Sequence, residues 1–375
     1  MKFVLAFDSF KGSIDSPQVC SIVEECIKVK IPEAEIVCLP MADGGENTAP
    51  IIAEVLGGEM KTIGYVQGPL TKMKVLAGYG SILEKKIAIV EVAIASGIAL
   101  LAPDNLAPIE SSTFGTGELL NDAFKNDYET VYLSLGGSAT NDGGMGAAVA
   151  LGWNFLDKDG EQLAPCGKSL IEIEKVIAPT ELSNWPKVKV LCDVHNPLYG
   201  NNGAAYVFGP QKGADQEQIE FLDKGLRNLA RVVKKDLGKD IANIQGAGAA
   251  GGFGAGAVAF LNAELVPGID TIMEWLDFAK HVDDADWIIT GEGCLDDTSF
   301  QGKVLSGVSK IAREKKVKLA AIAGRVKASS ASLIVAGVDV VEAAAPSTIP
   351  DVEALANSVQ LLKEATNRIV VKMTQ

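Results

Sequence analysis

The feature that most restricts the fold of this chain is an alternation of buried strands and amphipathic helices near its start. An apolar run at 2–7 predicts a strand, and apolar residues then recur at helical spacing over 17–27. Ser16 is the expected N-terminal cap of that helix. A second strand at 36–39 leads into a helix expected near 48–56, which gives the order β-α-β-α.

The last part of the chain repeats this alternation. Strands and helices are expected in turn over 287–290, 304–315, 319–323, 329–336, 338–343 and from 351 onward. Such alternation is typical of an α/β fold with a parallel, doubly wound sheet and right-handed crossovers. We therefore expect residues 1–60 and 280–375 to form one discontinuous domain, with residues 61–279 inserted as a second α/β domain. A chain of 375 residues exceeds the size that one hydrophobic core usually supports, which agrees with two domains.

The expected insertion has a different pattern. Short alternating runs over 60–95, separated by Gly and Pro, predict antiparallel strands. Helices are expected at 117–125 and 216–235, and a strand at 189–192 ends just before Asp193. The inserted domain should therefore mix helices with strands of both directions.

Charge and cysteine content narrow the functional class. The net charge of −14 argues against nucleic-acid or anionic-membrane partners, because both need a basic surface. The six cysteines form no CxxC pair, which indicates reduced thiols in a cytoplasmic protein instead of a zinc site or a disulfide framework. Asp8 interrupts the first apolar run too early for a signal peptide, and no internal stretch is a convincing membrane span. The sequence leaves the oligomeric state open.

A glycine-rich loop follows the strand expected at 131–135, and a helix is expected at 145–151. The loop residues that could face a ligand are Gly136, Gly137, Ser138, Thr140 and Asn141. A strand, a glycine loop and a helix start together present several backbone N–H groups to an anion. A tight turn without any ligand is the alternative interpretation.

Polar residues follow three of the expected strands. They are Asp8 and Lys11 after the first strand, Asp43 after the second, and Glu292 and Asp296 after the strand at 287–290. In an open parallel sheet, ligands bind beyond the carboxyl ends of the strands. We therefore expect these side chains to lie along one edge of the sheet, although each could instead cap a helix or stabilise a turn.

The chain contains no standard nucleotide-binding motif. Residues 167–169 resemble the end of a P-loop, but Gln162 occupies the position of its first glycine. The glycine run at 246–257 contains a GxGxxG match, yet the residues before it do not predict a strand, so close packing of glycines is the favoured interpretation. Two histidines are too few for a histidine metal cage, and His195 could either support a site near Asp193 or be solvated.

The remaining polar inventory points to phosphoryl transfer. Carboxylates suit Mg²⁺, a lysine offers a positive charge to phosphate, and glycine loops supply backbone N–H groups. Phosphoryl transfer needs mainly this positioning and charge neutralisation, with a base near the accepting hydroxyl. The residues themselves therefore predict a small-molecule kinase that uses Mg²⁺ and ATP without a P-loop.

Several longer motifs resemble those of the glycerate kinase type-1 family. They are DSFKGS at 8–13, PMADGGE at 40–46, GTGEL at 115–119, GGSATNDGG at 136–144, CDVHNPLYG at 192–200, FGPQKGA at 208–214, GAGAAGGFGAG at 246–256 and TGEGCLD at 290–296. Their number and their order along nearly the whole chain make the resemblance specific.

The resemblance implies ATP-dependent phosphorylation of D-glycerate, commonly to 2-phosphoglycerate, in a cytoplasmic organic-acid pathway. It also implies a flavodoxin-like domain that carries a large inserted α/β domain, with the active cleft between them. The chain departs from the family pattern at Asn47, where Gly is usual, at Cys294, where Arg is usual, and at 297–299. The missing Arg would weaken a contact to a carboxylate or phosphate.

We expect the phosphates of Mg·ATP to bind against the loop at 136–141. D-glycerate is expected near Lys11, with Asp8, Asp43 and Gly44 as further substrate-binding residues, and Lys11 is also a candidate catalytic residue. No nucleic acid or membrane is expected as a partner.

Asp193 is the expected general base, with metal binding as its alternative role. Asp43, Glu292 and Asp296 are the candidate Mg²⁺ ligands. Two other functions remain to be separated from a kinase: an organic-acid-sensing protein without chemistry, and a dinucleotide-dependent oxidoreductase, which rests on the GxGxxG match alone.

Overall fold

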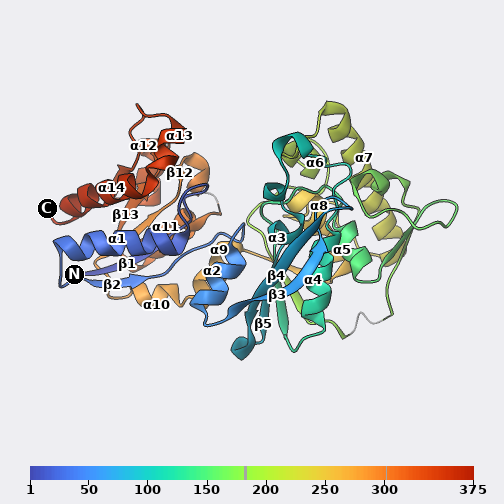
Figure 1. Cartoon of the computed structure of the whole chain (residues 1–375), viewed down its shortest axis with the longest axis horizontal. Coiled ribbons are helices and arrows are strands. Elements are labelled where there is room, and N and C mark those ends of the chain that lie inside the picture. The colour runs from blue at the N-terminus through green and yellow to red at the C-terminus, as the bar shows by residue number, and fades with distance from the viewer. Residues whose placement is uncertain (181–183, 301) are drawn as a thin grey trace. The chain divides into compact units, whose positions relative to one another are not determined.

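The computed structural model describes residues 1–180, 184–300 and 302–375. The chain forms two compact units (Figure 1): unit 1 comprises Met1–Asp43 and Ile269–Gln375, and unit 2 comprises Gly44–Gly268. Compared with the predicted division, residues 44–60 lie in unit 2 and residues 269–279 lie in unit 1. Helix α2 (Thr48–Val55) belongs to unit 2 because it packs against three strands of that unit.

Unit 1 is built on a parallel sheet of five strands in the order β15-β13-β11-β1-β2. The strands are β1 (Lys2–Phe7), β2 (Glu35–Cys38), β11 (Trp287–Gly291), β13 (Lys318–Ala323) and β15 (Val340–Ala343). In sequence order this is the 2-1-3-4-5 arrangement of flavodoxin-type sheets, whose direction of winding reverses between β1 and the third strand, here β11. The predicted parallel α/β architecture is confirmed.

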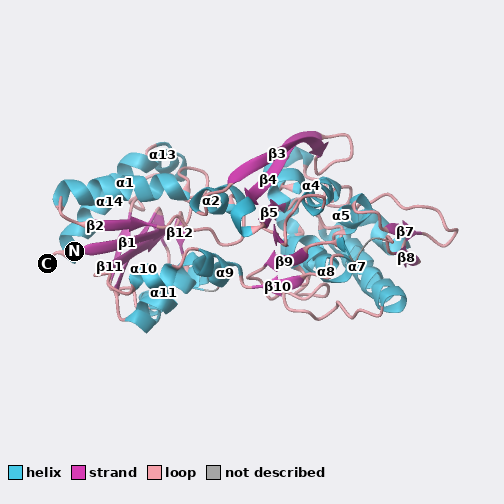
Figure 2. Ribbon diagram, turned by 90° about the horizontal axis from the view of Figure 1, so that it is seen from below, coloured by secondary structure: helices cyan, strands magenta, loops and turns pink. Residues whose placement is uncertain are grey.

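Helices cover both faces of this sheet (Figure 2). On one face α1 (Ser16–Lys30) packs against α14 (Ser358–Met373), and on the other α11 (Val304–Lys315) packs against β11 and β13. The remaining elements are α9 (Gly268–Trp275), α10 (Phe278–Val282), α12 (Ser330–Ala336), α13 (Asp351–Ala356), β12 (Cys294–Leu295) and β14 (Arg325–Val326).

The predicted cap of α1 is wrong. Asp15, not Ser16, caps the helix, and its carboxylate accepts a hydrogen bond from the backbone N–H of Gln18 at 2.8 Å. Ser16 is already helical and its hydroxyl donates to the carbonyl oxygen of Phe7 at 2.7 Å. An ionised aspartate is the stronger acceptor for the free N–H groups of a helix start, which explains the choice.

Unit 2 contains a mixed sheet of six strands in the order β10-β9-β6-β5-β4-β3. The strands are β3 (Glu59–Gln67), β4 (Lys74–Ile82), β5 (Ile87–Glu91), β6 (Thr130–Ser134), β9 (Lys187–Leu191) and β10 (Glu264–Val266), with a separate pair formed by β7 (Asn154–Leu156) and β8 (Lys175–Ile177). β3, β4 and β5 pair antiparallel, as the pattern over 60–95 predicts, and the other pairs of the large sheet are parallel.

The helices of unit 2 include α7 (Gln216–Leu237), whose N-terminus is closed by a capping box between Asp215 and Gln218. Besides α2, the unit also contains α3 (Val92–Ser96), α4 (Phe114–Phe124), α5 (Met145–Ala150), α6 (Ala204–Phe208) and α8 (Ala249–Phe260). α7 buries Leu222, Leu226 and Leu229 completely in the core of the unit. Each such leucine contributes about 2 kcal/mol of hydrophobic stabilisation.

The glycine run at 246–257 packs closely against the glycine loop, as its composition predicts. A Cβ on Gly251 would lie 2.1 Å from the carbonyl oxygen of Thr140, and one on Gly256 would lie 2.1 Å from that of Gly143. Gly251 also has a left-handed backbone with φ +66°, and its carbonyl accepts a hydrogen bond from the N–H of Gly143. Close packing therefore accounts for glycine at these two positions.

Within the described part of the chain, no helix combines the length and the apolar character needed to cross a bilayer.

Candidate active site

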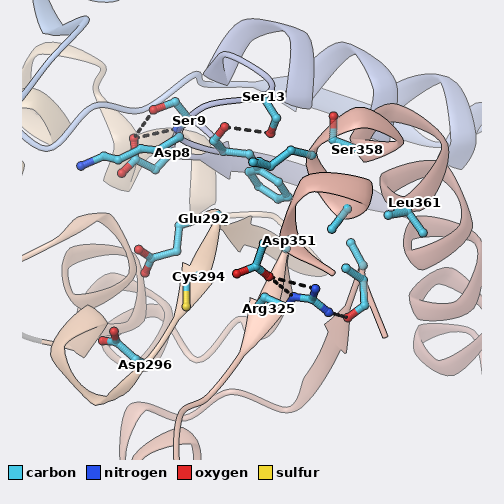
Figure 3. Close-up of a pocket in the computed structure, with 18 of the residues that line it drawn as sticks. Asp8, Ser9, Ser13, Glu292, Cys294, Asp296, Arg325, Asp351, Ser358 and Leu361 are labelled. Carbon is cyan, nitrogen blue, oxygen red and sulfur yellow. Dashed lines mark hydrogen bonds and ion pairs between the residues drawn. The ribbon is translucent and has the colours of Figure 1, made fainter. Parts of the chain in front are cut away.

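A cavity of about 420 Å³ lies in unit 1 beyond the carboxyl ends of β1 and β11 (Figure 3). This is the point at which the winding of the sheet reverses, where open α/β sheets bind their ligands. The five polar residues predicted to share an edge of the sheet, Asp8, Lys11, Asp43, Glu292 and Asp296, all line it. Their gathering follows from the topology, because β1, β2 and β11 are neighbouring parallel strands.

One end of the cavity holds carboxylates with perturbed ionisation. Burial and the nearby charge of Asp43 raise the pKa of Asp8 to about 7, although the backbone N–H of Ser9 donates to it at 2.7 Å. Burial also raises the pKa of Glu292. Asp8, Asp43 and Glu292 repel one another electrostatically, so this end of the cavity favours a cation or a proton.

Cations lie around the same carboxylates. The charge of Lys11 partly opposes the rise in the pKa of Asp8. The Nζ of Lys303 lies 3.9 Å from a carboxylate oxygen of Glu292. Asp296 is half-buried directly after β12, and its pKa is lowered because Thr298 donates hydrogen bonds to it from both its hydroxyl and its backbone. Carboxylates and lysines together suit an anionic ligand that binds as a complex with a metal ion.

The other end of the cavity is shaped by Arg325, which pairs in register with Cys294 across β12 and β14. Its guanidinium donates to the carboxylate of Asp351 at 3.0 Å and to the carbonyl oxygen of Ile349 at 2.6 Å. These bonds fix the segment 345–351 beside the cavity, as Figure 3 shows for Arg325 and Asp351. Arg325 thus lies beside Cys294, the position where the family resemblance led us to expect an arginine, but its guanidinium is committed to this segment.

The donor chemistry of the cavity fits Mg²⁺, which prefers oxygen ligands and is usually held by one or two carboxylates with substrate phosphates and water. In the described residues, no group of three or more Asp, Glu, His or Cys side chains is arranged to hold a metal ion. Asp43 and Glu292 would therefore supply only part of a coordination shell.

In unit 2 the predicted glycine loop follows β6, and its first glycines contact the segment 45–46. A Cβ on Gly136 would lie 2.4 Å from the Cα of Gly45, and one on Gly137 would lie 2.3 Å from a carboxylate oxygen of Glu46. Thr140 and Asn141 are completely buried, so their side chains are not open to solvent in this conformation. Of the predicted phosphate-binding side chains, only that of Ser138 belongs to a residue with remaining exposure, at 7%.

The turn at 44–49 contains Asn47, where the family resemblance led us to expect a glycine. Asn47 has a left-handed backbone with φ +64°, a conformation that glycine adopts freely and that asparagine tolerates better than most residues. The buried carboxylate of Glu91 accepts hydrogen bonds from the backbone N–H groups of Asn47 and Ala49, and Ser134 donates to the carbonyl oxygen of Gly45 at 2.8 Å. Asn47 therefore adopts a backbone conformation that a glycine at this position would also allow.

Asp193 follows β9, which pairs in parallel with β6, so it lies at the same sheet edge as the glycine loop. It is half-buried, and its Oδ1 accepts a hydrogen bond from the backbone N–H of Gly268 at 2.9 Å. His195 is exposed, in agreement with the solvated alternative.

Sequence reasoning missed one buried cation in unit 2. Lys212 is 2% exposed, and its Nζ lies 2.8 Å from the Oγ of Ser138. It stands inside the motif FGPQKGA at 208–214. This motif was the sequence feature that could have drawn attention to Lys212. Lysine is so rarely buried, however, that its position beside the glycine loop could not be expected.

The cavity of unit 1, lined by carboxylates and a lysine at the carboxyl edge of a parallel sheet, has the chemistry expected of a small-molecule kinase. Residues 3–374 match the Glycerate kinase family. The chain belongs to that family, and it is a phosphotransferase.

Individual relatives agree with this assignment. The chain is 41% identical to the glycerate kinase of Halalkalibacterium halodurans over 370 residues, which cover 98% of this chain and 97% of the relative. It is 40% identical to the glycerate 2-kinase of Escherichia coli over 331 residues, covering 86% of this chain and 85% of the relative. A crystal structure from Salmonella typhimurium LT2 superposes with a TM-score of 0.85 at 36% identity, covering 100% of this chain and 98% of the other.

Proposed function

We propose that this enzyme transfers the γ-phosphoryl group of ATP to a hydroxyl of D-glycerate and forms 2-phosphoglycerate in the cytoplasm. The observation that carries the proposal is the cavity of unit 1, where Lys11 lines the same space as Asp8, Asp43 and Glu292. In a chain that belongs to the glycerate kinase family, this is the part of the surface best suited to a small hydroxy acid and a metal ion.

D-glycerate is proposed to bind at the polar end of the cavity. Lys11 is exposed and supplies a positive charge for the substrate carboxylate or for the transferred phosphate. Asp8 and Asp43 would accept hydrogen bonds from the two hydroxyl groups. Gly44 follows Asp43 with φ +77°, and this turn allows its backbone to approach a substrate closely.

Mg²⁺ is proposed to bind to Asp43 and Glu292, with Asp296 as the alternative ligand. Bound there, the ion would neutralise charge on the phosphates of ATP. The raised pKa of Glu292 supports this proposal, because a buried carboxylate with acidic neighbours gains most from a divalent cation.

The phosphates of ATP are proposed to bind against the loop that begins at Gly136 and Gly137, using its backbone N–H groups and the hydroxyl of Ser138. Thr140 and Asn141 belong to this site as its buried support, because their side chains lie beneath the surface. Glu46 lies beside Gly137 and would repel an anion, so phosphate binding here depends on a counter-charge.

Asp193 is proposed as the general base that accepts the proton of the reacting hydroxyl. The hydrogen bond from the N–H of Gly268 holds one of its oxygens and fixes the direction of the carboxylate. An alternative role for Asp193 is metal binding.

The test is ADP release from Mg·ATP with a panel of hydroxy acids: D-glycerate, L-glycerate, lactate, malate and tartronate. The proposal predicts turnover that depends on both Mg²⁺ and D-glycerate. Saturable binding of D-glycerate without ADP release would indicate the competing function, an organic-acid-sensing protein without chemistry. Turnover with another acid but not with glycerate would refute the substrate assignment while leaving the kinase class intact.

A further inference from the structure

Lys212 is a buried cation in unit 2. It ends a short 3₁₀ turn, Pro210–Lys212, and its Nζ donates to the Oγ of Ser138 at 2.8 Å and to the carbonyl oxygen of Thr140 at 2.6 Å. Across the described residues, no Asp or Glu oxygen lies within ion-pair distance of this ammonium group. A buried positive charge without a paired anion is costly, so its place calls for an explanation.

The acidic residue that acts on Lys212 is already committed elsewhere. Asp142 is completely buried and accepts hydrogen bonds from the backbone N–H and hydroxyl of Thr113 and from the N–H groups of Gly144 and Gly146. It is the charged group that influences Lys212 among the described residues, and burial still lowers the pKa of Lys212 to about 7. The carboxylate of Asp142 is therefore held by donors of its own, and the ammonium group of Lys212 bonds to Ser138 and Thr140 instead.

A second observation points to a ligand at the same loop. In the part of the chain that the structure describes, the hydroxyl of Thr140 and both polar atoms of the Asn141 amide are buried without a hydrogen-bond partner. Buried polar groups without partners are rare in folded proteins, so each one calls for an explanation. The loop thus combines a buried ammonium group with buried polar atoms that lack hydrogen-bond partners.

The hydrogen bond from Lys212 makes the hydroxyl oxygen of Ser138 an acceptor. Because Nζ donates to Oγ, the hydroxyl proton of Ser138 is free to be donated to another acceptor. Ser138 also belongs to the outer part of the loop, since it keeps 7% of its exposure while Thr140 and Asn141 keep none. A phosphoryl oxygen is a strong acceptor for such a hydroxyl, and the adjacent ammonium strengthens the bond.

We propose that Lys212 is a positioning residue that polarises the hydroxyl of Ser138 and directs it to a phosphoryl oxygen of the bound nucleotide. Lys212 does not touch the nucleotide; it supplies the counter-charge that Glu46 makes necessary. This inference rests on the proposed function, because it assigns the anion at the glycine loop to the phosphates of ATP.

The test measures affinity for inorganic tripolyphosphate and for Mg·ADP by isothermal titration calorimetry in wild type, Ser138→Ala, Lys212→Met, Lys212→Arg and the S138A/K212M double variant. Loss of a charge-assisted hydrogen bond should weaken binding about tenfold to a hundredfold in each neutral single variant. The double variant should lose little more than either single one, because both changes remove the same interaction. Lys212→Arg should restore most of the affinity.

Proton uptake provides the readout that a purely structural lysine would not change. An anion at Ser138 favours the charged form of Lys212, so wild-type binding near pH 7.5 should take up part of a proton, and binding to Lys212→Met should take up less. Lys239 is a matched control, since burial lowers its pKa too and its Nζ donates to the carbonyl oxygen of Ala259 at 2.8 Å. Lys239→Met should leave anion affinity and proton uptake unchanged.

The outcomes distinguish a failure of the role proposed for Lys212 from a failure of the proposed kinase activity. If wild type binds Mg·ADP but Ser138→Ala binds it equally well, or if the losses in the double variant simply add, the role of Lys212 is refuted and the kinase assignment stands. If the wild type phosphorylates glycerate but does not bind tripolyphosphate, the anion site is refuted alone. If Lys212→Met folds poorly, Ser138→Ala and Lys212→Arg still test the proposed interaction.

Discussion

Asp8 should make unit 1 less stable at alkaline pH, and replacing it with asparagine should remove that effect. Its carboxyl is 7% exposed and has a pKa raised from 3.8 to about 7 by burial and by Asp43. The folded state therefore holds a proton that the unfolded chain releases near pH 4. Stability falls as pH rises from about 4 to 7, and the penalty is complete above 7.

The magnitude follows from the shift in pKa. Each pKa unit corresponds to about 1.4 kcal/mol, so a shift from 3.8 to about 7 gives a penalty of at most about 4 kcal/mol. Asp8→Asn is neutral at every pH and keeps the acceptor for the backbone N–H of Ser9. It should raise the melting temperature of the ligand-free enzyme by several degrees at pH 8 and leave it nearly unchanged at pH 4.

The assay is thermal unfolding from pH 4 to pH 8.5, with Asp296→Asn as the control of opposite sign. Hydrogen bonds from Thr298 lower the pKa of Asp296, so its ionised form stabilises the fold above the unfolded pKa, and the variant should lose stability at neutral pH. An Asp8→Asn variant that melts at the wild-type temperature at pH 8, or whose gain does not depend on pH, would refute the reasoning.

Three further perturbations test separate parts of the account. Asp193→Asn should lower kcat by about 10²–10⁴ and leave the affinity for ATP nearly unchanged, as steady-state kinetics and nucleotide titration would show; an unchanged kcat would remove it as the base. Lys11→Ala should raise the KM for glycerate by about tenfold or more without lowering the melting temperature, because Lys11 is exposed; wild-type kinetics would contradict its role. Gly251→Ala should cost more than about 2 kcal/mol in denaturant unfolding, because its Cβ would lie 2.1 Å from the Thr140 carbonyl oxygen, whereas Gly238→Ala, with similar φ and open space, should cost about 1 kcal/mol.

The parallel sheet of unit 1 could be predicted because its strands and helices are local patterns. The helix expected at 304–315 has those bounds in the structure, since its apolar spacing and its flanking residues agree. The helix expected from 351 onward instead forms two helices, α13 and α14, which meet at Asn357. Asparagine favours helix ends over helix interiors, a weak signal that periodicity alone does not capture.

The meeting of Asp8 with Glu292 could also be predicted, because it follows from the order of parallel strands. The burial of Thr140 and Asn141 could not, because it depends on α8, more than a hundred residues later in the chain. The burial of Lys212 beside Ser138 was equally invisible, since no local pattern distinguishes a buried lysine from a solvated one. The predicted and observed loops therefore differ in the exposure of their side chains, which depends on packing against segments far away in the sequence.

The most direct test of the central claim is phosphorus NMR of a reaction containing the enzyme, Mg·ATP and D-glycerate. The account predicts that the γ-phosphate signal of ATP disappears while ADP and a phosphomonoester appear in equal amounts. That ester should be a doublet, because the phosphate of 2-phosphoglycerate couples to the single proton on C2. A triplet would show transfer to the 3-hydroxyl instead, and ATP that stays intact in the presence of D-glycerate would contradict the proposed activity itself.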